Sequence, residues 1–210
     1  MLNNLKQILI VIVKQIAIAF FFTSFVFFVS YLVFHKKLST YMSLLANYTI
    51  VEKEGSSEAI YDKDKLHLIK YPNYGTIYAK MTIPSIDVKV NVYYGDSLEI
   101  LKYGAGHSSQ TYFPGEGGTI LVAAHNAKYY FGLIPELIIG DKIIYDTNYG
   151  KFTYEVTKTE IKEASILEQM EIQHDYEELV MYTCYPVNRP GLKTKRFVVY
   201  SKLVGVEYES

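Results

Sequence analysis

The single cysteine of the chain stands where a nucleophile would be reachable. Cys184 ends the apolar run LVMYTC and is followed by Tyr185 and Pro186, and the proline stops strand pairing. A side chain at the end of a strand faces a loop mouth, where a substrate can reach a thiol. The alternative is a buried cysteine that fills the core, which is common for free cysteine. The residue alone leaves both interpretations open.

A cysteine nucleophile needs a base or a positive neighbour, because a thiol with a pKa near 8.5 is only about 3% thiolate at pH 7. His125 directly follows the apolar run TILVAA, which puts an ionisable ring where a buried strand emerges. A satisfied core histidine is the alternative. The other four histidines have plainer settings, at the membrane boundary, in a tether, in a loop and in a polar run: His35, His67, His107 and His174.

Arginine is scarce in this chain, and its two copies lie close to the cysteine. Arg189 and Arg196 stand against 19 lysines, and both fall within 12 residues of Cys184. Where lysine supplies generic positive charge, an arginine is favoured for its planar donor fork, which suits an oxyanion or a substrate backbone. Chance placement on a solvated strand is the alternative.

Short β runs with turn residues between them must position these side chains. Alternating or continuous apolar runs predict strands, and they occur at 76–83, 87–94, 119–124, 142–146, 152–160, 179–184 and 197–203. Short helices are expected near 96–103 and 127–137. About eight short strands with few helices between them indicate a closed or nearly closed β-barrel.

An apolar segment precedes the predicted barrel. Ile16 to Phe34 is 19 residues long without a charge, just enough for a helix to cross a hydrocarbon core of about 30 Å. A cleaved signal peptide is the alternative, but its apolar core is shorter and it ends in small residues, whereas this segment ends in Tyr31–His35. We therefore expect a retained single-pass anchor, residues 16–34, in a lipid bilayer. Lysines on both flanks give only a slim preference for a cytoplasmic N-terminus.

Composition narrows the class of protein. The 210 residues carry a net charge of −1, so no strong field exists to recruit nucleic acid. The single cysteine excludes an intramolecular disulfide and any cysteine-based zinc cluster. We expect an N-terminal stub and anchor at 1–36, a tether or N-terminal arm at 37–73, the barrel at 74–205 and a tail at 206–210.

Three segments together resemble the sortases, membrane-anchored cysteine transpeptidases of Gram-positive bacteria. GEGGTILVAAHN (115–126) is similar to the histidine strand of that family, YTCYP (182–186) to its cysteine strand, and KRFVVY (195–200) to its arginine strand. Thr-Cys-Tyr-Pro most resembles the class D sortases. The resemblance runs from about Tyr74 to Leu203 and implies the eight-stranded sortase β-barrel.

The resemblance also implies roles for particular residues. Cys184 would attack a threonine carbonyl in a sorting motif such as Leu-Pro-x-Thr-Gly, with His125 as acid and base and Arg196 stabilising the oxyanion or clamping the substrate. Further residues are expected to contact substrate: Thr183, Ala124, Ile166 and Leu167. The loop SSQTYFPGEGG offers only Glu116 as an acid, so no metal and no cofactor is predicted.

The implied partners are exported surface proteins that carry the motif and an amine from a peptidoglycan precursor or cross-bridge. A substrate of this kind puts the barrel outside the cell and the N-terminus inside. One alternative is an L,D-transpeptidase-like cysteine enzyme of the cell wall. Another is a non-catalytic, membrane-anchored binding module in which Cys184 only packs the core.

Overall fold

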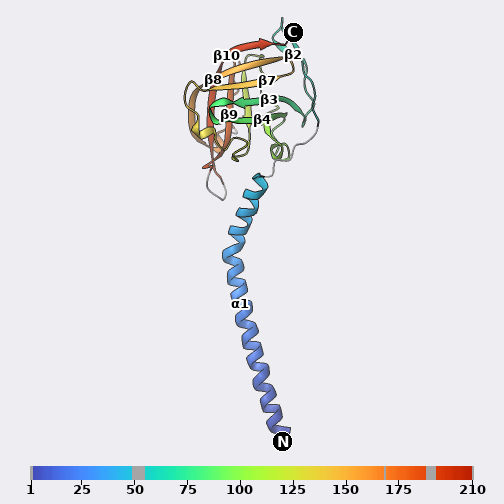
Figure 1. Cartoon of the computed structure of the whole chain (residues 1–210), viewed down its shortest axis with the longest axis vertical. Coiled ribbons are helices and arrows are strands. Elements are labelled where there is room, and N and C mark those ends of the chain that lie inside the picture. Colours follow the sequence, from blue (N-terminus) through green and yellow to red (C-terminus); the bar gives the residue numbers. More distant parts are fainter. Residues whose placement is uncertain (1, 49–54, 168, 188–192, 210) are drawn as a thin grey trace. The chain divides into compact units, whose positions relative to one another are not determined.

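The computed structural model describes residues 2–48, 55–167, 169–187 and 193–209, in two compact units at 1–46 and 47–210. The first unit consists of helix α1 (Leu2–Tyr48) (Figure 1). Its Leu9–Leu32 span has 24 residues, a mean hydropathy of 2.2 and no burial within the protein. At 1.5 Å per residue this span is about 36 Å long, which is enough to cross a bilayer core. The apolar span therefore begins before Ile16, where the sequence prediction started it. It contains one lysine, Lys14.

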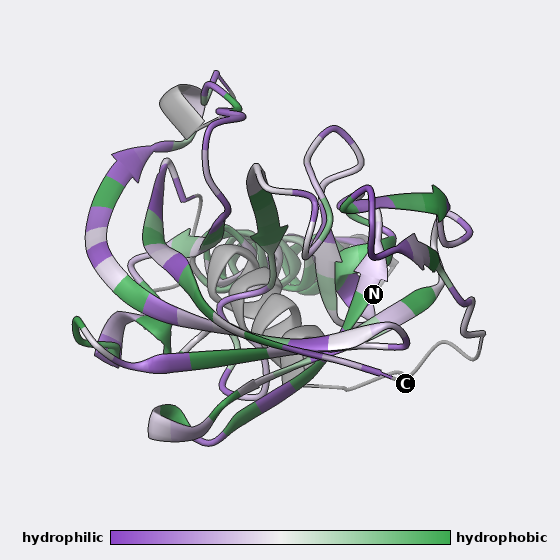
Figure 2. Cartoon of the chain, turned by 90° about the horizontal axis from the view of Figure 1, so that it is seen from above, coloured by the Kyte–Doolittle hydropathy of each residue, from purple (hydrophilic) through white to green (hydrophobic). Residues whose placement is uncertain are grey.

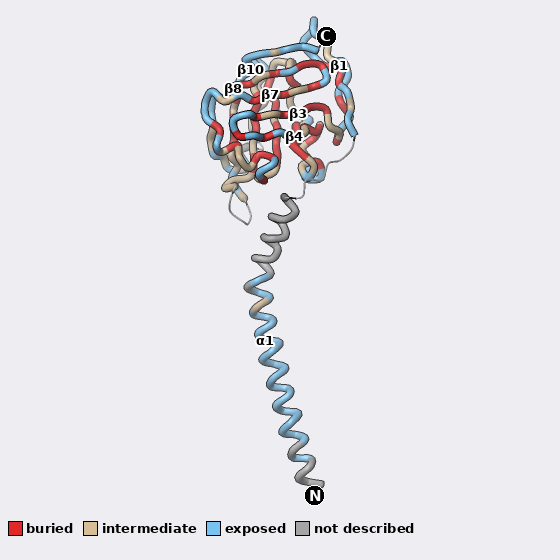
Figure 3. The backbone as a smooth tube through the Cα atoms, viewed as in Figure 1, coloured by how far each residue is buried: buried red, intermediate tan, exposed pale blue. Residues whose placement is uncertain are grey.

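Helix α1 offers its apolar side chains to the surroundings rather than to a protein core. Figure 3 shows its described residues as exposed for almost the whole apolar span. The Thr23 hydroxyl donates to the Ala19 carbonyl at 2.7 Å, so this polar group is satisfied within the helix.

The second unit is a closed eight-stranded barrel, which confirms the predicted fold. Strands adjoin in the order β10-β8-β7-β3-β4-β5-β6-β9. Their bounds are β3 (Ile77–Ile83), β4 (Val88–Tyr94), β5 (Ala105–His107), β6 (Thr119–Ala123), β7 (Lys142–Thr147), β8 (Gly150–Glu163), β9 (Glu178–Tyr185) and β10 (Lys195–Tyr208). Strand β6 runs parallel to β9 and β4 parallel to β5, whereas the remaining pairs are antiparallel.

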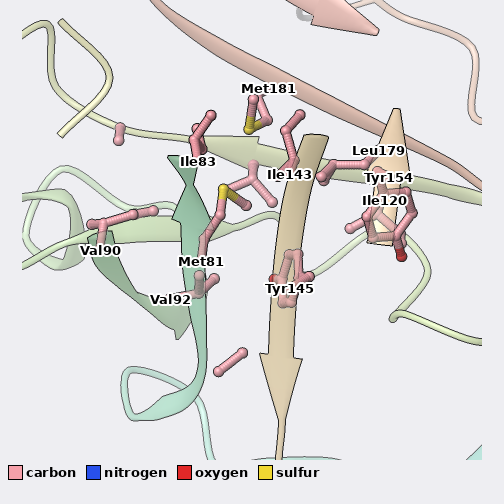
Figure 4. Close-up of a cluster of buried hydrophobic side chains, with 14 of the residues drawn as sticks. Met81, Ile83, Val90, Val92, Ile120, Ile143, Tyr145, Tyr154, Leu179 and Met181 are labelled. Carbon is pink, nitrogen blue, oxygen red and sulfur yellow. The ribbon is translucent and has the colours of Figure 1, made fainter. Parts of the chain in front are cut away.

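Alternation of residue type along the strands fills the barrel. Figure 2 shows hydrophilic and hydrophobic residues alternating along the long strands, as expected when one face of a strand is buried and the other solvated. The buried cluster drawn in Figure 4 combines side chains from most of the barrel strands, among them Met81, Ile83, Val92, Ile120, Ile143, Tyr145, Tyr154, Leu179 and Met181.

The irregular segments differ from the sequence expectations. The expected helices are single 3₁₀ turns, Ile100–Lys102 and Ile134–Glu136, the second opened by Pro135. Strand β5 was not expected, because its three residues carry no readable alternation. Strand β10 continues to Tyr208. Residues 206–208 therefore pair with β8 instead of forming the expected tail.

The N-terminal arm contains a small hairpin, β1 (Ile60–Asp62) with β2 (His67–Lys70). Its Leu68 side chain is buried, and the Leu68 backbone N–H donates to Glu116 Oε1 at 2.9 Å. The Tyr61 hydroxyl donates to the Gly115 carbonyl at 2.6 Å. The hairpin is therefore packed on the loop between β5 and β6.

Candidate active site

Strand direction and register bring Cys184, His125 and Arg196 to one edge of the barrel. Because β6 and β9 are parallel neighbours, their carboxyl ends meet at the same edge, where β6 leads into His125 and β9 reaches Cys184. Strand β10 is antiparallel to β9 and begins there, with Arg196 directly opposite Cys184.

The three side chains line one cavity of about 400 Å³, which we call the thiol cavity. Thr183 and Ala124 line it as well, and a contact of either residue with substrate stays a prediction. Ile166 and Leu167 belong to the short helix α2 (Ala164–Leu167), but their side chains lie outside what the structure describes.

A pair of hydrogen bonds joins the ends of β6 and β9 beside the thiol. The Thr183 hydroxyl donates to the Ala124 carbonyl at 2.9 Å, and the Ala124 N–H donates to the Tyr182 carbonyl at 3.3 Å. Thr183 is only 1% exposed, so its hydroxyl is committed to this contact. The hydroxyl hydrogen bond holds Ala124, which precedes His125, against Thr183, which precedes Cys184.

His125 is partly buried at the rim of the barrel. Burial lowers the pKa of its imidazole below the ordinary value, which keeps the ring neutral at pH 7. The His125 carbonyl accepts the Phe131 N–H at 2.9 Å, and the Tyr130 ring lies edge-on to the imidazole with centroids 6.5 Å apart. A neutral ring in this position can accept a proton.

Arg196 is held from its own side of the cavity. Its Nη1 donates to the Lys193 and Lys195 carbonyls, each at 3.0 Å. To the residues that the structure describes, Nε and Nη2 of Arg196 make no hydrogen bond. Arg189, the other arginine, lies outside the described residues.

Lys193 adds a second cation that the sequence reasoning did not single out. Its amine donates to the Pro186 carbonyl. Burial lowers the pKa of this amine, and the negative charge of a Cys184 thiolate opposes that shift, so the two groups interact electrostatically. The sequence signal that could have identified Lys193 is its position in the loop between Cys184 and Arg196.

The polar residues Asp96, Ser108, Gln110 and Thr111 also line the thiol cavity, and apolar side chains form another wall of it. They project from the outer faces of β6 and β9 and from the loop between β8 and β9, and they comprise Leu121, Ala123, Tyr182, Met170 and Ile172. Val180 and Val198 are fully buried beneath this wall. The cavity thus places a thiol, an imidazole and a guanidinium beside an apolar wall.

His107 is a core residue that does not itself line the thiol cavity. The ring is fully buried, with Nδ1 at 2.6 Å from the Tyr78 hydroxyl and Nε2 at 3.0 Å from the Thr111 hydroxyl. Burial lowers the pKa of His107 to about 3. Its role is to connect the barrel interior to the loop that carries Thr111.

A closed eight-stranded barrel with cysteine, histidine and arginine at one strand edge defines the class of cysteine transpeptidases with the sortase fold. The sortase domain model matches residues 81–204. The chain belongs to the sortase family and is a sortase-family transpeptidase. This membership decides against the L,D-transpeptidase alternative and against a mere binding module.

Individual relatives agree with that assignment. The chain is 34% identical over 133 residues to Sortase D of Bacillus subtilis, covering 63% of this chain and 67% of that protein. A Clostridium perfringens Sortase D5 transpeptidase superposes with a TM-score of 0.57 at 26% identity, covering 63% of this chain and 82% of the other. C. perfringens sortase C, solved with the C-terminal cell wall sorting motif, gives 0.57 at 28% identity, covering 63% and 73%. The class D relatives agree with the resemblance seen in Thr-Cys-Tyr-Pro.

Proposed function

We propose that this transpeptidase cleaves a C-terminal Leu-Pro-x-Thr-Gly-like sorting motif after threonine and transfers the protein to an amine of the cell wall. The observation that supports this most directly is the thiol cavity, where Cys184, His125 and Arg196 line the same space beside an apolar wall. The relative that was solved with the C-terminal cell wall sorting motif supports the same class of substrate.

The first half-reaction forms a thioester. The Cys184 thiol loses its proton to the neutral His125 ring, and the thiolate attacks the threonine carbonyl carbon. Arg196 donates to the oxygen that becomes negative in the tetrahedral intermediate. When the intermediate collapses, the C–N bond breaks and the leaving amine takes the proton from His125.

The second half-reaction transfers the acyl group. A primary amine from a peptidoglycan precursor or cross-bridge attacks the thioester carbon and gives a proton to His125. The C–S bond then breaks, which restores the Cys184 thiolate and leaves a new amide bond. The apolar wall excludes water from one side of the thioester.

The leucine and proline of the motif pack against the apolar wall, because these residues precede the threonine and need an apolar surface. We include Ile166 and Leu167 among the contacts, since they lie in the same loop as Met170 and Ile172. The backbone at Ala124 borders the same groove.

We place α1 in the bacterial cell membrane as a single-pass anchor, with the N-terminus in the cytoplasm and the barrel outside. The span Leu9–Leu32 is long and apolar enough, although a signal sequence would also satisfy that test. An exported substrate requires the extracellular side. Detection of the intact N-terminus in the membrane fraction would support the anchor.

The direct test traps the thioester. The full-length chain in detergent is mixed with a peptide containing Leu-Pro-Ala-Thr-Gly, first without and then with triglycine as the amine. Mass spectrometry should show the protein heavier by the peptide acyl group on Cys184, followed by release of a triglycine adduct. Cys184→Ala should give neither species. Cleavage without an acyl adduct, or cleavage that survives Cys184→Ala, would overturn the proposal.

A further inference from the structure

A second cavity of about 580 Å³ adjoins the thiol cavity and takes no part in the chemistry described so far. The two cavities share Gln110, Thr111 and Ile172 in their walls. We call the second one the tyrosine cavity, because its lining includes three tyrosines beside a phenylalanine and a carboxylate: Tyr71, Tyr94, Tyr112, Phe113 and Glu116.

The tyrosine cavity lies at the end of the groove opposite the thiol. Thr119 begins β6, and its backbone accepts from the Tyr112 N–H at 3.0 Å and donates to the Gln173 carbonyl at 3.2 Å. The loops that line the tyrosine cavity are therefore attached at the start of β6, whereas Cys184 and His125 lie at the carboxyl ends of β9 and β6. The six-residue rise along β9 from Glu178 to Cys184 corresponds to about 20 Å, the length of a short extended peptide.

The apolar wall sets the direction of a bound peptide, and this step rests on the proposed function. With the threonine carbonyl at Cys184, the preceding leucine and proline lie against Leu121 and Tyr182, between the two cavities. The polypeptide on the N-terminal side of that leucine then enters the tyrosine cavity. This segment stays attached to the transferred protein, so contacts to it act in both half-reactions.

The chemistry of the tyrosine cavity suits a cation. The Glu116 carboxylate is fixed by the N–H groups of Leu68 and Phe113, both at 2.9 Å, and so remains ordered beside the rings. Aromatic faces attract lysine and arginine, and a fixed carboxylate adds to this attraction. No lysine or arginine occurs among the described residues that line the cavity.

Two histidines also line the tyrosine cavity, and they leave its preference for a cation unchanged. His174 Nδ1 lies 2.5 Å from the Tyr112 hydroxyl, and His67 Nδ1 lies 3.4 Å from the Lys65 carbonyl. These contacts orient both rings by hydrogen bonds to neutral groups. Gln110 and Ser109 supply further neutral polar lining.

We propose that the tyrosine cavity binds a lysine or arginine side chain that lies one to three residues before the leucine of the sorting motif. The cavity would then recognise a segment of the substrate that lies outside the sorting motif, on its N-terminal side. A basic residue in this segment would distinguish the substrates of this transpeptidase from other exported proteins with the same motif.

The test compares three peptides that share Leu-Pro-Ala-Thr-Gly, using the full-length chain in detergent with triglycine. One has lysine two residues before leucine, the second has glutamate there, and the third begins at an acetylated leucine. The wild type should cleave the lysine peptide with a KM about five- to tenfold below that of the glutamate peptide, as one cation–π contact and one exposed ion pair would give.

Glu116→Gln should reduce that ratio to about twofold. The same variant should cleave the acetylated peptide as the wild type does, which shows that the barrel is folded. Glu136→Gln is the matched control, because Glu136 is exposed and lines neither cavity, and it should retain the full ratio.

The outcomes separate this inference from the proposed function. Equal KM values for the lysine and glutamate peptides would overturn the inference while leaving the transpeptidase activity intact. Failure to cleave any of the three peptides would refute the proposed motif specificity itself. If Glu116→Gln changed the KM for triglycine and not for the peptides, the cavity would belong to the acceptor amine, and the inference would be wrong.

Discussion

Replacing Thr183 with valine should separate a structural role for this residue from a substrate-binding one. Valine keeps the shape of threonine but removes the hydroxyl that donates to the Ala124 carbonyl at 2.9 Å. Because Thr183 is 1% exposed, water cannot replace the lost donor easily. Removing one such buried hydrogen bond costs about 1–2 kcal/mol of unfolding free energy.

The expected change can be followed as a melting temperature and as a rate. For a unit of this size, about 1.5 kcal/mol corresponds to a fall of about 3–6 °C in Tm. Loosening the contact also frees His125 to move relative to Cys184, and a misplacement near 1 Å can cost about 100-fold in rate. We therefore expect Thr183→Val to lower kcat strongly with little change in the KM for the peptide.

Ser201→Ala provides the matched control for that variant. Ser201 is also 1% exposed, and its hydroxyl donates to the Leu179 carbonyl of β9 at 2.8 Å, away from the thiol cavity. It should lose a similar amount of Tm and keep its kcat. If Thr183→Val instead kept its Tm and kcat and only raised the KM for the peptide, the hydroxyl would contact substrate and our structural interpretation would be wrong.

Arg196→Lys should lower kcat about 100-fold in the peptide cleavage assay, because lysine cannot present the planar fork and one oxyanion donor is worth about 3 kcal/mol. Arg189→Ala should keep near wild-type activity, and the reverse pattern would assign the arginine role to Arg189. A separate prediction concerns His107, whose pKa is about 3 in the folded protein. The unfolded chain binds a proton near pH 6.5 whereas the folded chain does not, so His107 lowers stability progressively as the pH falls from about 6.5 to about 3, by up to about 1.4 kcal/mol per pH unit. Denaturant unfolding of His107→Gln should show a shallower loss across that window, and a slope equal to that of the wild type would contradict the buried neutral ring.

Strands with clear alternation could be read from the sequence, and so could the three scarce side chains at their ends. The runs that became β6 and β9 were readable because each is apolar and ends at a polar residue. Strand β5 was not, since Ala105, Gly106 and His107 show no period. The sortase resemblance supplied the relation among Cys184, His125 and Arg196 that spacing alone left open.

The parts of the two cavities that could not be predicted from the sequence lie mostly in loops. Met170 and Ile172 line the thiol cavity in the loop where Ile166 and Leu167 were expected to contact substrate. Periodicity does not specify which loop residues point inward, because their backbone is set by tertiary contacts rather than by a repeat. For the same reason the tyrosine cavity, which combines the N-terminal arm, the end of β4 and two loops, could not be foreseen.

The β1–β2 hairpin determines where a soluble form of this enzyme should begin. Starting at residue 74, the expected barrel boundary, would delete Leu68 and Ala59, whose side chains are buried in the core of the second unit. It would also leave Glu116 without the Leu68 N–H and Asn148 without its two contacts to the Ala59 backbone. Expression vectors should therefore retain the chain from Gly55 onward, so that the arm continues to close the far end of the groove.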